Sequence, residues 1–196
     1  MQVGGIMKKF LSILSCLVLL VIITGCGNNK NSDDALKFKK EYEELNSSSV
    51  NMDISENNPI KYATFDEIID VLTKGTGVVY FGFPGCPWCR NAIPVLFEVA
   101  KENDVDTIYY FNPREIRNSG NDAYQQLTTI LNDYLEENDE GVKTLYVPDV
   151  YFVKDGKIMG NHLSTVDSQS DPYNPLDEEQ RTELKNIYQN LFDKIK

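Results

Sequence analysis

The apolar positions along most of the chain repeat at the spacings of helices and strands. Residues 64–75, TFDEIIDVLTKG, have apolar side chains at helical spacing, with Thr64 before them, Glu67 three residues later and Gly75 at the end. Threonine and glutamate at this spacing form a capping box, and glycine commonly ends a helix. Residues 77–83, GVVYFGF, lack polar alternation and are rich in β-branched and aromatic residues, so they predict a strand buried on both faces at the centre of a sheet.

The rest of the C-terminal part continues this alternation. Helices are predicted over residues 87–102, 122–138 and 177–195, and a strand is predicted over residues 105–113. Two apolar segments, VPDVYFV and KIMGNHL, flank an Asp-Gly pair at residues 155–156, which is a strong hairpin signal. This order of elements predicts one α/β domain, with helices packed on a central sheet.

The first part of the chain has two segments of different composition. Residues 7–26, MKKFLSILSCLVLLVIITGC, join two lysines, an apolar stretch and small residues, which is the layout of a secretory signal, and an uncleaved anchor helix is the alternative. The next residues are rich in Asn, Ser and charged side chains, so we expect a flexible tether with at most a short helix over residues 35–45. The predicted organisation is a signal peptide at 1–25, a tether at 26–58 and a domain at 59–196.

The end of the signal resembles a bacterial lipoprotein signal, although Ile23 stands where leucine is usual. The resemblance implies that Cys26 receives a lipid and becomes the N-terminus after cleavage. Two acyl chains hold a protein stably on a bilayer. We therefore expect a lipid-anchored protein on the extracytoplasmic face of the cell membrane.

The net charge of the processed chain argues against some classes of binding partner. Cleavage before Cys26 removes two lysines and no acids, which leaves 17 basic and 30 acidic residues and a net charge of −13. Nucleic acids are bound by clustered positive charge, and anionic lipid surfaces attract basic segments. We expect no nucleic-acid partner, and no adhesion of the domain to lipid by charge.

Two of the four cysteines are placed for chemistry. Cys16 leaves with the signal and Cys26 is expected to be acylated, so Cys86 and Cys89 remain and no disulfide framework supports the fold. The sequence places Cys86 at the N-cap of a helix, with Pro87 after it, where unpaired N–H groups and the helix dipole stabilise a thiolate. Cys86 is the candidate nucleophile, and Cys89, one turn later, is the candidate that resolves a mixed disulfide.

Two other interpretations of this pair stay open. A zinc site needs four ligands, and the processed chain offers only His162 besides the two thiols. A buried, inert pair is the second alternative, although Pro84 and Gly85 before the motif favour exposure. Arg90 is predicted either to lower a thiol pKa by its charge or to be solvated.

The chain after the tether resembles thioredoxin-like proteins. The resemblance rests on the apolar strand before the two cysteines, on Pro94 eight residues after the first of them, and on Val147 and Pro148 before DVYFVKDGK. It implies a thioredoxin-like fold, with a central mixed sheet flanked by helices and a helical insertion before a strand that opens with a cis proline. By the same resemblance Val147 and Pro148 hold substrate backbone beside the cysteines, and Trp88 packs against it.

The departures from the family pattern concern the surroundings of the cysteines. Tyr80 stands where thioredoxins usually have a buried acid, and Pro-Trp replaces Gly-Pro between the cysteines. The segments CPWCR, VKDGKI and DPYNPLDEEQ are similar to those of bacteriocin transport accessory proteins of Gram-positive bacteria.

The resemblance implies an enzyme, a thiol-disulfide oxidoreductase. We expect it to exchange a Cys86–Cys89 disulfide with cysteines of exported proteins, as a monomer, with no cofactor beyond the redox-active disulfide. An unidentified membrane partner would donate or accept the electrons. The alternative is a non-catalytic binding module of the same fold that is accessory to peptide (bacteriocin) export.

Overall fold

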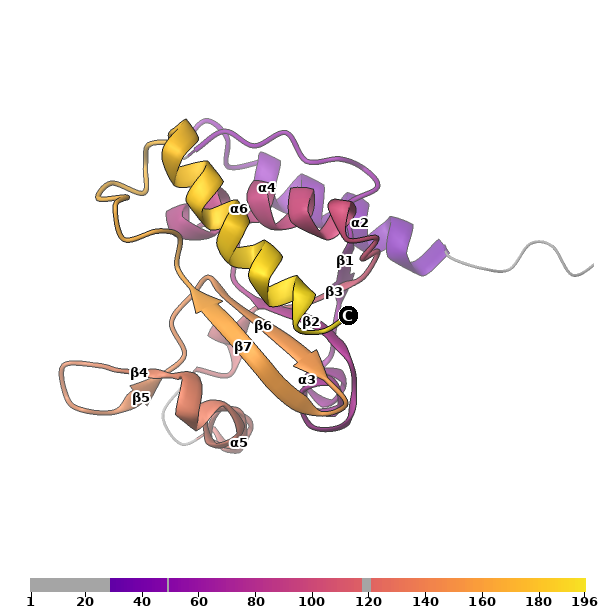
Figure 1. The fold of residues 1–196 in the computed structure, drawn as a ribbon, viewed down its shortest axis with the longest axis vertical. Coiled ribbons are helices and arrows are strands. Elements are labelled where there is room, and N and C mark those ends of the chain that lie inside the picture. The colour runs from indigo at the N-terminus through magenta and orange to yellow at the C-terminus, as the bar shows by residue number, and fades with distance from the viewer. Residues whose placement is uncertain (1–28, 49, 118–120) are drawn as a thin grey trace, which may run out of the picture.

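A central sheet with helices on both faces organises the computed structural model, which describes residues 29–48, 50–117 and 121–196. The elements are α2 (Asn29–Glu43), β1 (Ile60–Tyr62), α3 (Phe65–Lys74), β2 (Gly77–Phe81), α4 (Pro87–Glu102), β3 (Ile108–Phe111), α5 (Asp122–Leu131), β4 (Glu136–Glu137), β5 (Lys143–Thr144), β6 (Asp149–Lys154), β7 (Lys157–Leu163) and α6 (Glu178–Asp193). Figure 1 shows β2, β3, β6 and β7 at the centre of this arrangement and the β4–β5 hairpin at its left edge.

The five-stranded sheet is mixed, with the strand order β1-β3-β2-β6-β7. Strands β1, β3 and β2 run parallel, whereas β6 is antiparallel to both β2 and β7. Strand β2 is in the middle, and its residues 78–81 are fully buried. The predicted central strand and the predicted α/β fold class are therefore confirmed.

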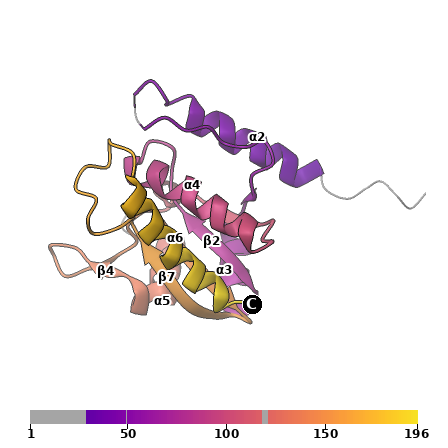
Figure 2. The same cartoon turned by 45° about the horizontal axis from the view of Figure 1, so that its top comes forward.

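Helices α2, α4 and α6 pack on one face of the sheet, and α3 and α5 pack on the other. Figure 2 shows α2 beside α4 on the first face, where the rings of Phe38 and Phe97 lie 5.9 Å apart. Within the described part of the chain, no helix has the length and apolar character needed to cross a bilayer.

The segment predicted as a tether belongs to this packed structure from residue 29 onward. Its buried apolar residues are Ala35, Phe38, Tyr42, Val50, Met52 and Ile54. The first three recur at helical spacing and the last three alternate along extended backbone, so a few apolar residues suffice to form one buried side. The prediction of a flexible tether was wrong. It relied on the overall composition, which does not show the helical and the alternating spacing of these apolar residues. The signal segment and Cys26 lie outside the described residues.

The insertion between β3 and β6 also differs in part from its prediction. Helix α5 ends at Leu131 rather than at residue 138, and a 3-10 turn, Asn132–Tyr134, leads into the hairpin of β4 and β5. Leu135 is 4% exposed, so its burial in the core draws the chain out of the helix. Glutamates favour helices in general, but here tertiary packing overrides that preference.

Candidate active site at the start of α4

The two cysteines lie where β2 leads into α4. Cys86 is the N-cap of α4, with Pro87 in the first turn, as predicted. Its sulfur accepts a hydrogen bond from the backbone N–H of Cys89 at 3.2 Å. Both cysteines are free in the structure. This geometry directs the amide groups of the helix start at one sulfur.

The surroundings shift the pKa values of the two thiols in opposite directions. The pKa of Cys86 is lowered by a hydrogen bond from the Cys89 thiol, by backbone N–H groups of Cys89 and Trp88, and by the charge of Arg117, although burial opposes the shift. The pKa of Cys89 is raised well above its usual value, first by burial and then by the neighbouring Cys86. Of the two thiols, Cys86 is therefore the one that loses its proton at the lower pH.

Both cysteines are less exposed than the sequence indicates. Cys86 is 5% exposed and Cys89 is 0% exposed, although Pro84 and Gly85 favour an open corner. The Cys86 thiol points at the carbonyl oxygen of Val147, 3.7 Å from its sulfur, and this packing closes part of the corner. Of the two side chains, only Cys86 keeps any exposed surface, so the sulfur of a substrate would contact that residue first.

The structure brings the other residues implied by the resemblance to the same place. The Val147–Pro148 peptide bond is cis, and its Val147 carbonyl faces Cys86 from a position 61 residues along the chain. Val147 and Trp88 are both half-buried, whereas Pro148 is buried. A partly open surface of backbone and apolar side chains thus borders the nucleophilic sulfur.

Arg117 is a site residue that sequence reasoning missed. It follows β3, and its guanidinium donates a hydrogen bond to the carbonyl oxygen of Leu145, two residues before Val147. Its charge contributes to the lowered pKa of Cys86. The predicted topology could have revealed Arg117. Strands β2 and β3 are parallel neighbours, so the residues that follow them lie at the same edge of the sheet.

Arg90 is a buried anchor, and its prediction as a solvated residue was wrong. Its side chain is 0% exposed and joins the start of α4 to the N-terminal segment, residues 29–58. The guanidinium donates to the carbonyl oxygens of Val50 (2.8 Å), Tyr42 (2.6 Å) and Pro84 (3.3 Å), and to the side-chain oxygen of Asn46 (2.7 Å). Four acceptors compensate the loss of water around this charge.

The structure also bears on the alternative of a zinc site and on its only further candidate ligand, His162. Over residues 29–48, 50–117 and 121–196, no group of three or more His, Cys, Asp or Glu side chains is arranged to hold a metal ion. His162 bonds the backbone carbonyl of Thr165, with Nε2 at 2.5 Å from the oxygen. The backbone therefore satisfies this ring nitrogen of the histidine.

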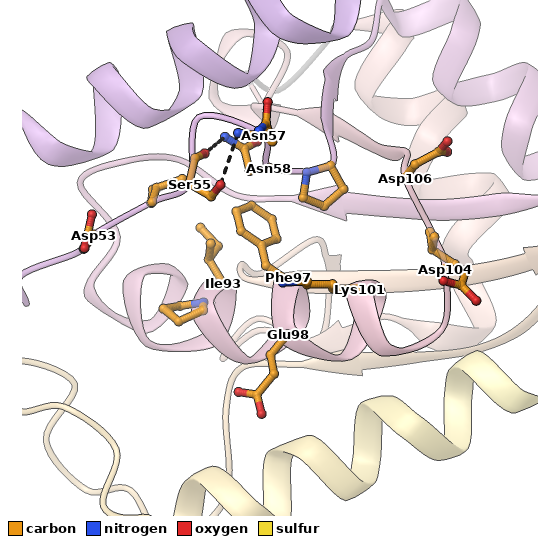
Figure 3. Close-up of a pocket in the computed structure, with 14 residues that line it drawn as sticks. Asp53, Ser55, Asn57, Asn58, Ile93, Phe97, Glu98, Lys101, Asp104 and Asp106 are labelled. Atoms are coloured by element: carbon orange, nitrogen blue, oxygen red, sulfur yellow. Dashed lines mark hydrogen bonds between the residues drawn. The ribbon is translucent and has the colours of Figure 1, made fainter.

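A groove of about 800 Å³ lies away from the cysteines, between α4 and the N-terminal segment (Figure 3). Its apolar lining includes Ile93, Pro94 and Phe97 of α4, together with Pro59. None of the candidate site residues lines it. The groove is therefore separate from the thiol site.

Comparison with known proteins gives a fold likeness only. No family model matches the chain, and no curated protein matches it. Among solved structures, thioredoxin O2 of Arabidopsis thaliana in the oxidized state is similar, with a TM-score of 0.42, 17% identity, and coverage of 69% of this chain and 96% of that one. Thioredoxin O1 of the same plant has a TM-score of 0.40 and 20% identity, and covers 68% of this chain and 97% of that one. Values this low carry no argument about chemistry, which rests on the geometry of the site.

Proposed function

We propose that this protein is a thiol-disulfide oxidoreductase in which Cys86 is the nucleophile and Cys89 resolves the mixed disulfide. The observation that carries the proposal is the opposite environment of two thiols one helical turn apart. The Cys89 thiol, the helix start and Arg117 favour the thiolate of Cys86, whereas burial keeps the proton on Cys89. Thiol exchange needs this division between an attacking thiolate and a reserve thiol.

The reaction proceeds by two displacements at sulfur. The Cys86 thiolate attacks a disulfide, the bond between the two substrate sulfurs breaks, and one substrate sulfur leaves with the electron pair. Cys89 then attacks Cys86, the mixed disulfide breaks, and the second substrate sulfur leaves and takes up the proton that Cys89 releases. The substrate gains two electrons and the protein forms the Cys86–Cys89 disulfide. The reverse sequence oxidises a dithiol, and the reduction potential relative to the partner sets the direction.

Substrate backbone would lie along Val147 and Pro148, with Trp88 beside it. The Val147 carbonyl accepts the hydrogen bond of the free Cys86 thiol, and Cys86 has no proton to donate once it is in a mixed disulfide. That carbonyl is then available to an N–H group of an extended peptide, as in recognition by strand pairing. The apolar surface of Trp88 would cover the neighbouring substrate side chain.

The proposed location follows from the sequence of residues 7–26. A lipid on Cys26 would hold the chain on the extracytoplasmic face, where exported proteins with cysteines are the substrates and a membrane protein exchanges electrons with the pair. Helix α2 begins only three residues after Cys26. The folded domain would therefore sit close to the bilayer rather than at the end of a long tether.

A non-catalytic binding module is the second candidate, and a specific observation favours it. Only 5% of Cys86 is exposed, so a bulky partner must open the corner before its sulfur can react. A module that binds peptides through Val147 and Trp88 would not need that opening.

The two candidates are separated by trapping the intermediate on a peptide that contains a disulfide. We expect Cys89→Ser to accumulate a mixed disulfide between Cys86 and the peptide, detected by mass spectrometry, because the resolving thiol is missing. Cys86→Ser is the matched control and should trap nothing. Absence of a trapped species in Cys89→Ser, with peptide binding retained, would support the binding module instead.

A further inference from the structure

A pair of buried tyrosine hydroxyls adjoins Cys89. The hydroxyl oxygens of Tyr42, in α2, and Tyr80, in β2, lie 3.0 Å apart, and both residues are 0% exposed. Burial raises the pKa of Cys89, and hydrogen bonding by the nearby Tyr80 hydroxyl opposes that shift. Polar groups as deeply buried as these are held in place by the few partners they have. The resolving thiol thus has a fixed polar neighbour on the side away from solvent.

The chain provides space for the Tyr80 hydroxyl. A Cβ atom at Gly82 would lie 2.0 Å from that oxygen, so only glycine leaves room for the hydroxyl there. The Tyr80 ring stacks on Tyr110 with centroids 5.5 Å apart, and the Tyr42 ring stacks on Phe38 with centroids 4.2 Å apart. Packing therefore fixes both rings, and the orientation of the hydroxyls follows from it.

Tyr42 is bound to the start of α4 through its backbone as well as its side chain. Its carbonyl oxygen accepts the 2.6 Å hydrogen bond from Arg90, the residue immediately after Cys89. The N-terminal segment consequently reaches the two cysteines by two routes, one through Arg90 and one through Tyr80. The site is incomplete without α2.

We propose that Tyr80 is a further catalytic residue, which donates a hydrogen bond to the Cys89 sulfur as that sulfur attacks the mixed disulfide, and that Tyr42 positions its hydroxyl. This inference rests on the proposed function. When Cys89 carries negative charge, Tyr80 donates to the sulfur and accepts from Tyr42. Either hydroxyl can be the donor within the pair, so the arrangement needs no movement of the rings.

The tyrosines stabilise charge and do not take the proton. Burial raises the pKa of both hydroxyls well above their usual value, so each keeps its proton at neutral pH. Cys89 forms its bond to Cys86 while the bond between Cys86 and the substrate sulfur breaks. The substrate sulfur leaves with the electron pair and receives the proton from Cys89, so the step is balanced with no further reactant.

The test separates the two displacements in time. Reduced protein is mixed with one equivalent of dithiobis(nitrobenzoate), a disulfide that releases a coloured aromatic thiol at each displacement. The first phase reports attack by Cys86 and the second reports resolution by Cys89. The full chain is used in detergent with Cys16→Ser and Cys26→Ser, so that the pair alone reacts.

Tyr80→Phe removes the hydroxyl and retains the ring. We expect it to slow the second phase roughly tenfold and to move the pH midpoint of that phase upward, because a hydrogen bond to a charged group is lost. The first phase should keep its wild-type rate. Tyr42→Phe should slow the second phase by a smaller factor, since it removes only the positioning partner.

Tyr188→Phe is the matched control. Tyr188 is also 0% exposed, and burial, Asp149 and Cys89 raise its pKa, but its hydroxyl has no hydrogen-bond partner among the described residues. Both phases should therefore be unchanged in this variant. An unchanged second phase in Tyr80→Phe, or equal slowing in Tyr188→Phe, would overturn the inference. Failure of the wild-type first phase would instead count against the proposed function.

Discussion

Two segments outside the central sheet each reach a different cysteine. The N-terminal segment, residues 29–58, contacts the Cys89 side of the site through Tyr42 and Arg90. The insertion between β3 and β6 contacts the Cys86 side through Arg117 and Val147. The sheet and α4 alone would hold the two thiols at the same helix start. The flanking segments make their environments unequal.

The two segments differ in how far water enters their contacts. Arg90 and Tyr42 are fully buried and hydrogen-bonded, whereas Arg117 and Val147 are half-buried. Loss of a partner costs most where no water can replace it. We therefore expect changes in the buried contacts of the N-terminal segment, including those with Arg90 of α4, to affect stability and the reactivity of Cys89, and changes in the insertion to adjust Cys86 with little loss of stability.

The largest effect is expected at Arg90. Arg90→Ala removes the hydrogen bonds that the guanidinium donates to Tyr42, Val50, Pro84 and Asn46, and it leaves the Val50 and Pro84 carbonyl oxygens without that donor. We expect the free energy of unfolding to fall by roughly 3–5 kcal/mol, measured by urea denaturation. The exposed Arg114→Ala is the control and should change it by less than about 0.5 kcal/mol. Similar losses in both variants would contradict the buried-anchor role.

A pH-dependent effect is expected at Asp149, which directly follows Pro148. Burial raises the pKa of this carboxyl to about 7, against about 3.9 in an unfolded chain. The folded state therefore holds the proton between these values, so the stability that Asp149 contributes is present at low pH and lost as pH rises through about 7. Asp149→Asn keeps the acceptor for Asn161 and removes the charge.

We expect Asp149→Asn to be more stable than the wild type at pH about 8, by up to roughly 4 kcal/mol, and nearly equal to it at pH about 4. Denaturation series at several pH values measure the difference. The exposed Asp139→Asn should give no pH-dependent gain. A gain that does not grow with pH would show that Asp149 is ionised in the folded protein throughout this range.

A smaller effect is expected from the insertion. Arg117→Gln removes the charge near Cys86 and leaves side-chain N–H groups that can still donate to Leu145. The pH midpoint for alkylation of Cys86 should rise by roughly half a unit to one unit. Arg114→Gln serves as the comparison, because Arg114 lies in the same loop with its guanidinium over the ring of Phe83. An equal shift in both variants would indicate a general effect of charge rather than a contact of Arg117.

Local signals account for what the sequence predicted well. The caps at Thr64 and Cys86, and the Asp-Gly turn between β6 and β7, depend on residues a few positions apart, and the structure has all three. Strand β1 has three residues, too few to show a period. The paired tyrosines are 38 residues apart, and Arg90 and Val50 are 40 apart. Contacts at such separations leave no local pattern, so the support of Cys89 was not visible from sequence.

The most direct test of the central claim is the pH dependence of alkylation at each cysteine, followed by mass spectrometry of the reduced wild-type chain. We expect Cys86 to be alkylated with a midpoint below the value of about 8.5 for a free cysteine, and Cys89 to react only at higher pH. A midpoint for Cys86 at or above that of free cysteine, or labelling of Cys89 first, would contradict it.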